Sequence, residues 1–359
     1  MSTPFTSLRP PRRALAAIAT LAVGSLLLAG CAQGDDDGGP VQASTKSCDG
    51  DKLSLTQSTT GFLYFPSYVA EEAGFYEDQG LDVSVKDLGG GAENVAAVVG
   101  GGADVALTAY SSIVTAREQG APVVAIGAVM EQYASNVVIS QEAADKAGVT
   151  EDSSPEDKIA ALQGLKLGIT SAGSGTDQLF HYLFKQGGMD ADDDAQLLPI
   201  GSGAPMLAAF RTGQIDGFSL SSPTSDLAAQ QNGVMLFDLS SGTYEPLEVF
   251  LYIVAVANSR TLEKKSRILT CFSKAIGQAL TLIQEDPEAA KAAGRSAFED
   301  IDEDLYDAAF ERNVAAFPLT PVIAKAQAEK VLDFVSSFEE LKEASVDNTV
   351  NTNLAEATQ

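Results

Sequence analysis

Two stretches of the chain resemble each other at a distance of 112 residues, and this repeat constrains the fold more than any other feature. Residues 89–105 and 201–217 share seven identities, six of which are glycine or alanine. Both residue types are abundant here, so chance is the alternative explanation. A shorter similarity relates KLSLT at 52–56 to KLGIT at 166–170. Two copies of a strand, turn, helix and strand predict two related lobes.

Short β-rich runs alternate with amphipathic helical stretches along most of the chain. Runs at 53–56, 81–85, 103–107 and 123–126 have the composition of strands, and the segments between them have helical spacing. Strands that alternate with helices form largely parallel sheets covered by helices. The sequence therefore predicts an α/β fold with two lobes.

The first thirty residues have the features of an export signal. Three arginines precede an apolar run at 14–30, which is too short to span a membrane well and ends in LAGC at 28–31. This tetrapeptide resembles the bacterial lipobox, which implies that residues 1–30 are removed and that Cys31 carries lipid. The alternative is an ordinary signal peptide in which Cys31 is only a small residue. A lipidated chain would lie at the extracytoplasmic face of the cell membrane.

The remaining chain is strongly acidic. Loss of residues 1–30 removes three arginines and no acids, so the balance is 20 − 49 = −29. Such a surface repels phosphates and excludes nucleic acid as a partner. Residues 31–50 are rich in Gly, Asp, Ser and Thr and are expected to form a tether, and residues 346–359 a polar tail that is loose or lies along the surface.

Two further cysteines remain in a chain that leaves the cytoplasm. Cys48 and Cys271 could form one disulfide, but two unpaired buried cysteines fit the sequence as well. With one histidine, His181, on an apolar helical run, the sequence supports neither a metal site nor a histidine-dependent catalytic dyad. It contains no Walker motif, and no cofactor is expected. We therefore expect a protein that is not an enzyme.

The candidate ligand site lies in the turns after the strands, because ligands of open α/β sheets bind beyond the carboxyl ends of the strands. The turn at 170–176 follows one strand and precedes a helix, where amide groups and glycines favour an anionic or polar ligand. Its hydroxyls could instead cap the helix. The candidates in this turn are Ser171, Gly173, Ser174 and Thr176.

Equivalent turns elsewhere supply further candidates. Some of these turns follow the first predicted strand, some lie at the start of the repeated segments, and some follow the strands at 103–107 and 215–220. Helix capping or core packing is an alternative explanation for each of these residues. These candidates are Thr59, Thr60, Phe62, Tyr64, Gly91, Tyr110, Ser111, Ser202 and Ser221.

The order of several segments resembles the nitrate, sulfonate, taurine and thiamine-precursor group of solute-binding proteins of ABC importers. The segments are AEEAGFYEDQGLDV at 70–83, GGGAE at 89–93, GADV at 102–105 and AREQGAPVV at 116–124. The resemblance implies a type II periplasmic-binding-protein fold, with lobe 1 at 51–133 and 248–345 and lobe 2 at 134–247.

The same resemblance implies two crossover strands that act as a hinge, near 130–137 and 242–250. Tyr133 and Tyr244 on these crossovers become candidate cleft residues, although hinge packing is an equal explanation. The resemblance also implies that the partners of this protein are an ABC permease and the ATPase of that permease, and that the binding protein itself is a monomer.

The ligand is less constrained than the fold. The turn at 170–176 favours a small organic anion of sulfonate type, whereas the candidate aromatic residues suit a neutral ring such as a pyrimidine. A surface sensor that keeps the binding fold without feeding a transporter is the alternative function.

Overall fold

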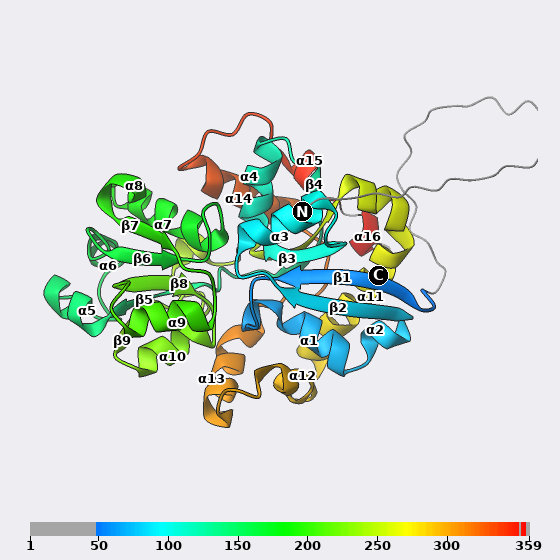
Figure 1. Ribbon diagram of the computed structural model, residues 1–359, viewed down its shortest axis with the longest axis horizontal. Coiled ribbons are helices and arrows are strands. Elements are labelled where there is room, and N and C mark those ends of the chain that lie inside the picture. The colour runs from blue at the N-terminus through cyan, green and yellow to red at the C-terminus, as the bar shows by residue number, and fades with distance from the viewer. Residues whose placement is uncertain (1–47, 352, 357–359) are drawn as a thin grey trace, which may run out of the picture. The chain divides into compact units, whose positions relative to one another are not determined.

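The computed structural model of this protein describes residues 48–351 and 353–356. The predicted signal peptide, the lipidation of Cys31 and most of the predicted tether lie outside the described residues. The described part contains two five-stranded sheets, each flanked by helices, and confirms the predicted two-lobed α/β architecture. In Figure 1 the strands β5 to β9 lie to the left, and the blue and cyan strands β1 to β3 lie to the right.

The sheet of lobe 1 has the strand order β2-β1-β3-β10-β4. The strand β1 pairs in parallel with β2 and β3, whereas β10 runs antiparallel to both β3 and β4. The apolar runs predicted as strands account for this sheet, and β10 returns from the second half of the chain. The strands are β1 Asp51–Gln57, β2 Leu81–Asp87, β3 Val105–Ala109, β4 Val123–Met130 and β10 Ile253–Asn258.

The sheet of lobe 2 has the order β7-β6-β8-β5-β9, which repeats the topology of the first. The strand β6 pairs in parallel with β7 and β8, and β5 is the antiparallel strand inserted between β8 and β9. The strands are β5 Asn136–Ser140, β6 Lys166–Ile169, β7 Gln196–Pro199, β8 Gly217–Leu220 and β9 Gly233–Phe237.

The repeat seen in the sequence is a repeat of strand register. Leu55 pairs with Val105 in lobe 1, and 112 residues later Leu167 pairs with Gly217 in lobe 2. The two repeated aspartates also have one role: Asp104 accepts a hydrogen bond from the amide of Ser54, and Asp216 accepts one from the amide of Lys166. Ser54 is therefore the structural equivalent of Lys166, so the shorter alignment of KLSLT with KLGIT was wrong by two residues.

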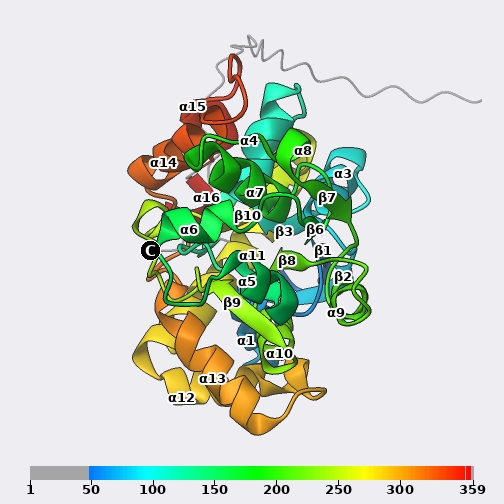
Figure 2. The ribbon, with the colours of Figure 1, turned by 90° about the vertical axis from the view of Figure 1, so that its left-hand side faces the viewer.

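Helices cover both faces of each sheet, and those of lobe 1 come from both ends of the chain. Figure 2 shows the helices of the second half, α12 and α13, lying beside α1 at one side of the molecule. The helices of lobe 1 are α1 Phe65–Glu72, α2 Phe75–Asp78, α3 Gly91–Gly100, α4 Tyr110–Glu118, α11 Ser259–Glu285, α12 Pro287–Gly294, α13 Glu303–Asn313, α14 Lys325–Ser336, α15 Val346–Thr349 and α16 Asn353–Glu356. Those of lobe 2 are α5 Gln141–Ala147, α6 Pro155–Ala160, α7 Gly175–Gln186, α8 Ala191–Asp194, α9 Ala204–Arg211 and α10 Thr224–Gln230.

The chain passes between the sheets twice, at 131–135 and at 238–252, and the two crossings are bonded to each other. The Gln132 side chain donates to the carbonyl oxygens of Leu239 and Leu247, at 2.8 and 3.1 Å. The amide of Tyr252 donates to the carbonyl of Met130, and the Tyr133 and Tyr252 rings stack with centroids 4.2 Å apart. The hinge is therefore a paired strip of backbone and not two independent linkers.

Cys48 and Cys271 form a disulfide in lobe 1. The sequence left this pairing open, and the structure makes it by placing α11 beside the residue that precedes β1. The bond closes a loop with a sequence separation of 223 residues. Such a crosslink stabilises a fold by about 2–4 kcal/mol, chiefly by restricting the unfolded chain.

The predicted polar tail after Ser345 is corrected by the structure, because its described part packs into lobe 1. Val350 forms a parallel bridge with Ala125 of β4. The Thr349 hydroxyl is buried and lies 2.6 Å from the hydroxyl of Tyr110, and the Leu354 side chain is also buried. The polar composition of this segment did not indicate packing, because its buried contacts are made by a few single side chains and not by a continuous apolar run.

We expect truncation after Ser345 to destabilise the protein by about 2–4 kcal/mol, because it removes one buried leucine and a buried hydrogen bond. Thermal unfolding measured by circular dichroism would show a lower midpoint. A second truncation after Glu356 keeps α15 and α16 and is the matched control. Equal midpoints for the two truncated chains would contradict the packing described here.

Candidate ligand-binding cavity

A small cavity of about 30 Å³ lies between the lobes. It admits at most a few water molecules, so the structure corresponds to a closed arrangement of the lobes. Of the sixteen residues of the described chain that line it, none carries a charge. They are Ser58, Thr59, Leu63, Tyr64, Gly91, Thr108, Ala109, Ser135, Thr170, Ser174, Gly175, Thr176, Leu220, Ser221, Tyr252 and Ile253.

The cavity lies at the carboxyl ends of the parallel strands of both sheets. Ser58 and Thr59 follow β1, and Thr108 and Ala109 end β3. In lobe 2, Thr170 follows β6 and Ser221 follows β8. Because the two sheets share one topology and their strand ends face each other, equivalent turns from both lobes meet at the same place.

Three helices begin at residues that line the cavity. Gly91 opens α3, Ala109 immediately precedes α4, and Gly175 and Thr176 open α7. The first amide groups of a helix have no acceptor within that helix, and the aligned peptide dipoles place partial positive charge there. The cavity therefore has an electropositive wall although no basic side chain reaches it.

A short hydroxyl network organises the wall supplied by lobe 2. The Thr176 hydroxyl accepts a hydrogen bond from the Thr170 amide at 2.9 Å and lies 2.9 Å from the Ser174 hydroxyl. Ser174 also caps α7 by accepting from the amide of Asp177. The alternative role foreseen from the sequence, helix capping, is thus filled by Ser174, and the same residue lines the cavity.

The Thr108 hydroxyl is the one polar group of the cavity wall that is buried without a partner among the described residues. The residue is 2 % exposed, and its Oγ1 makes no hydrogen bond with the protein. A buried hydroxyl without a hydrogen-bond partner costs about 1–3 kcal/mol of folding free energy. The stability of the fold alone gives no reason for a hydroxyl at this position. Its position next to Gly91 and Ser174 identifies it as a group that a ligand can satisfy.

Two tyrosines face the cavity as neutral phenols. Burial raises the pKa of Tyr64 and of Tyr252 above its ordinary value. The Tyr252 hydroxyl lies 2.6 Å from the Ser135 hydroxyl, so one ring links the second crossing to the first. Neither phenol ionises near neutral pH. Each tyrosine offers the cavity a neutral hydroxyl group that can form hydrogen bonds and an aromatic ring that can make apolar contacts.

Six of the residues predicted from the sequence lie at the cavity, and the other candidates do not. The first group comprises Thr59, Tyr64, Gly91, Ser174, Thr176 and Ser221. Phe62 is packed against Phe298, with ring centroids 4.6 Å apart, and Tyr110 bonds to Thr349 behind the sheet. An aromatic residue at a helix start faces the core or the cleft according to its packing, and here both face the core.

Tyr133 and Ser111 lie behind the cavity wall. The Tyr133 hydroxyl donates to the carbonyl of Gly175, and its pKa is raised well above the ordinary value by burial. The carbonyl of Ser111 accepts from the Gln178 side chain. These residues therefore hold the elements that carry the wall. Tyr244 packs edge-on against Phe237 of β9, away from the cavity, and Thr60 is exposed.

Ser171, Gly173 and Ser202 bond across the seam between the lobes. The Ser171 hydroxyl accepts from the amide of Ala92 at 3.3 Å, and the Gly173 carbonyl accepts from the Ser112 hydroxyl at 3.0 Å. The Ser202 hydroxyl donates to the carbonyl oxygens of Ser58 and Gly89. Their polar groups are thus used in closing the cleft.

The sequence-based candidates missed Thr108, Ser135, Thr170 and Tyr252, which the structure places at the cavity. Thr108 had a usable signal, because it is the single polar residue of the strand VALTA at 105–109 and stands at its carboxyl end. Ser135 and Tyr252 belong to the crossings, whose positions relative to the strand ends no local pattern reveals.

Glycines allow the lobes to approach closely around the cavity. A Cβ atom at Gly175 would lie 3.0 Å from the Cβ of Ala109 and 3.1 Å from the hydroxyl of Tyr252. At Gly90, a Cβ would lie 2.6 Å from the Ser171 hydroxyl. Larger residues at either position would hold the lobes apart.

The groove with the largest volume among those found in the described chain lies away from this cavity. A larger groove of about 610 Å³ lies on lobe 1, and no residue of lobe 2 lines it. The described residues contain no group of side chains arranged to hold a metal ion. No helix among them has both the length and the apolar character needed to cross a membrane.

Two related α/β lobes, joined by two bonded crossings around a polar cavity at their strand ends, define a two-lobed ligand-binding protein. The chain belongs to the family described as NMT1/THI5 like, whose model matches residues 63–290. This match covers lobe 2, both crossings and part of lobe 1.

Known proteins with similar sequences or structures agree with this class. The chain is 25% identical over 264 residues to YtlA of Bacillus subtilis (strain 168), named as a binding protein, and the match covers 73% of this chain and 75% of the relative. A solved structure from Bordetella bronchiseptica RB50 is 24% identical with a TM-score of 0.74, and covers 86% of this chain and 96% of its own. The alkanesulfonate-binding protein SsuA of Xanthomonas axonopodis pv. citri, bound to MOPS, is 16% identical with a TM-score of 0.66, covering 85% and 99%. These structures show the periplasmic-binding-protein fold.

The same fold also occurs in an enzyme. The desulfurization enzyme DSZB is 13% identical with a TM-score of 0.59, and the match covers 86% of this chain and 98% of the enzyme. Fold alone therefore does not separate binding from catalysis.

We expect Thr108→Val to leave the ligand-free protein as stable as the wild type or to raise its unfolding free energy by about 1 kcal/mol, because the substitution removes an unpartnered buried hydroxyl. Thr176→Val is the matched control, since it removes a hydroxyl that accepts from the Thr170 amide, and it should cost about 1–3 kcal/mol. Chemical denaturation would measure both changes. Equal losses in the two variants would mean that Thr108 has a structural partner.

Proposed function

We propose that this protein captures a small organic anion of sulfonate type in the interlobe cavity and delivers it to an ABC permease with its ATPase. The observation that carries the proposal is the cavity wall itself. Helix N-termini and hydroxyl groups from both lobes converge on a closed space that holds no charged side chain. Such an arrangement of donors and apolar surface supports the binding of a ligand.

Electrostatics favour an anion over a cation. Partial positive charge at the starts of α3, α4 and α7 points to one place, where the neighbouring hydroxyls can donate. In a closed cavity these dipoles act in a low dielectric and are not screened by solvent. A carboxylate in the wall would oppose this effect, and the wall contains none.

A sulfonate suits the site because its three oxygens accept several hydrogen bonds and its organic part needs apolar contact. We propose that Thr59, Thr108, Ser174, Thr176 and Ser221 serve the oxygens. Leu63, Leu220 and Ile253 line the same cavity and supply apolar surface. A neutral pyrimidine remains the second candidate, supported by the Tyr64 and Tyr252 rings.

The family and the fold support a role in import. The alkanesulfonate-binding protein among the similar structures binds a sulfonate, and we propose the same ligand class here. We also propose that the protein acts as a monomer at the outer face of the cell membrane, held there through lipid on Cys31. A sensor that binds the same ligand without a permease is the alternative.

A thermal-shift panel tests the ligand class. The chain without residues 1–31 would be screened against alkanesulfonates, nitrate, carboxylates and pyrimidines. A ligand that binds only the folded form adds about 2.7 kcal/mol of stability at a hundred times its dissociation constant. A shift with alkanesulfonates supports the proposal. A shift with pyrimidines alone would replace it with the neutral-ring alternative.

We expect Gly175→Ala to weaken the binding of whichever compound of the panel gives a shift. Overpacking costs about 1–3 kcal/mol, which corresponds to about 5- to 150-fold in the dissociation constant measured by calorimetry. Gly100→Ala is the matched control, because a Cβ there meets no atom within 4 Å. Equal affinity in the two variants would show that closure around Gly175 is not needed for binding.

We expect Cys31→Ser to release the protein from the membrane fraction when it is expressed with its own first thirty residues in a bacterial host. The lipid would be attached through the Cys31 sulfur, and several acyl chains at one site hold a protein stably on a membrane. Immunoblots of membrane and soluble fractions measure the change. Membrane retention of the serine variant would contradict lipid anchoring at this residue.

A further inference from the structure

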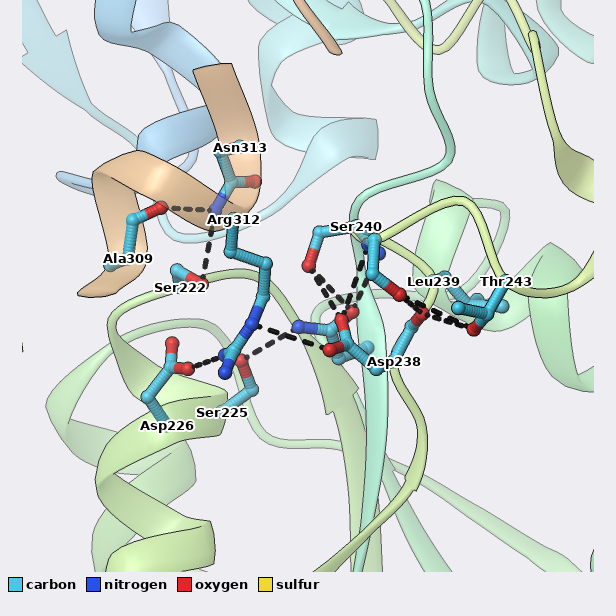
Figure 3. Close-up of polar contacts among 12 residues, drawn as sticks. Ser222, Ser225, Asp226, Asp238, Leu239, Ser240, Thr243, Ala309, Arg312 and Asn313 are labelled. Atoms are coloured by element: carbon cyan, nitrogen blue, oxygen red, sulfur yellow. Dashed lines mark hydrogen bonds and ion pairs between the residues drawn. The ribbon is translucent and has the colours of Figure 1, made fainter. Parts of the chain in front are cut away.

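One arginine of lobe 1 holds two carboxylates of lobe 2. Arg312, in the last turn of α13, hydrogen-bonds through Nη1 to Oδ1 of Asp226 on α10, and its Nε lies 3.3 Å from Oδ2 of Asp238, just after β9. Figure 3 shows the guanidinium between the two carboxylates, with α13 above and α10 below. The three residues join elements far apart in the sequence across the interlobe seam.

The two carboxylates differ in how they are held: Asp238 is hydrogen-bonded within lobe 2, and Asp226 is buried. The Asp238 Oδ1 accepts from the hydroxyl of Ser240 at 3.1 Å and from the amide of Ser241 at 3.3 Å. The Asp226 side chain is only 8% exposed, compared with 29% for Arg312. Asp238 is therefore positioned by lobe 2 independently of Arg312, and the arginine is the part of the triad that belongs to lobe 1.

Loss of the arginine would penalise the closed arrangement specifically. The second oxygen of Asp226, Oδ2, is buried and has no hydrogen-bond partner among the described residues. Without Arg312 the closed form would contain a buried carboxylate with no counter-charge, which is strongly destabilising. An open form would return that carboxylate to water, so the ion triad biases the balance between open and closed forms.

The ion triad is continuous with the wall of the cavity. Ser221 lines the cavity, and the next carbonyl, that of Ser222, accepts from the amide of Phe62 in lobe 1 at 3.1 Å. The Ser222 hydroxyl accepts from the side chain of Asn313, the neighbour of Arg312 on α13, at 3.3 Å. A movement of α13 relative to α10 therefore moves the cavity wall, which couples the ion triad to ligand access.

We infer that Arg312, Asp226 and Asp238 form an electrostatic latch that keeps the lobes closed over the cavity, so that ionic strength regulates how long a ligand is retained. The inference rests on the proposed function, because retention matters only to a protein that captures a ligand. The groove of about 300 Å³ beside the latch also contains Glu151 and Lys158, so ions of the medium reach its charges. Salt screens the Arg312–Asp238 pair, whose side chains are 29% and 31% exposed, more than the buried contact with Asp226.

The amide of Phe62 offers a direct probe of closure that needs no ligand. It donates across the seam to Ser222, whereas the amide of Leu88 donates to Gln57 within lobe 1. Hydrogen exchange of the full chain, followed by mass spectrometry, gives the rate of the Phe62 amide relative to the Leu88 amide. This ratio reports opening of the seam separately from unfolding of lobe 1.

In Arg312→Gln we expect the ratio to rise by about tenfold, the change that corresponds to about 1.4 kcal/mol. Arg211→Gln is the matched control, because the Arg211 side chain bonds to Gln231 within lobe 2, and it should leave the ratio unchanged. Adding Asp226→Asn to Arg312→Gln should restore part of the protection, since it removes the buried unpaired charge. Wild-type protein in 1 M KCl should move in the same direction as Arg312→Gln, by a smaller factor.

An unchanged ratio in Arg312→Gln, or a wild-type ratio that does not respond to KCl, would overturn the latch. Equal acceleration of both amides would also overturn it, because Arg312 would then stabilise the fold and not the closed form. If Arg312→Gln does not fold, the wild-type KCl series still decides. The hydrogen-exchange test involves no ligand. If no compound of the ligand panel binds, that result counts against the proposed function, whereas the latch is still tested by the exchange ratio.

Discussion

The paired crossings of the chain are the constraint on which the rest of the structure depends. Each crossing delivers the antiparallel strand of the sheet it enters, β5 in lobe 2 and β10 in lobe 1, so the sheet of lobe 1 is complete only when the chain returns from lobe 2. Gln132 and the backbone bonds between 130–131 and 250–252 hold the crossings together. The strand ends of both lobes are therefore directed at a single space, and relative motion of the lobes is confined to a hinge of a few residues.

The repeat explains why that space is lined as it is. Equal register at a spacing of 112 residues places equivalent turns of the two lobes opposite each other, and each turn leads into a helix. Helix starts and hydroxyls then supply the positive potential that basic side chains supply elsewhere, without bringing strongly hydrated charges into a closed cavity. The helix dipoles act only at short range. They can therefore favour an anion inside the cavity although the chain as a whole is acidic.

Closure depends on groups that lie outside the cavity. Glycines at the seam permit close approach, serine hydroxyls bond across it, and the contact between α13 and α10 adds charge. The residues that line the cavity and the residues that hold the lobes together thus overlap only in part, because Gly175 belongs to both sets. Short segments such as Ser221 and Ser222 connect the cavity wall to the contacts outside it.

The sequence by itself determined the α/β class, the repeat, the strand positions and the polar turns after the strands, because each of these follows from local periodicity and turn chemistry. The predicted strand at 81–85, for example, lies within β2 and begins at the same residue. Tertiary structure alone decided that Tyr64 faces the cavity while Phe62 enters the core, that Thr108 is buried without a partner, and that Arg312 meets Asp226. These outcomes depend on the direction of single side chains and on contacts between distant segments. Packing fixes both, and no short-range pattern records them.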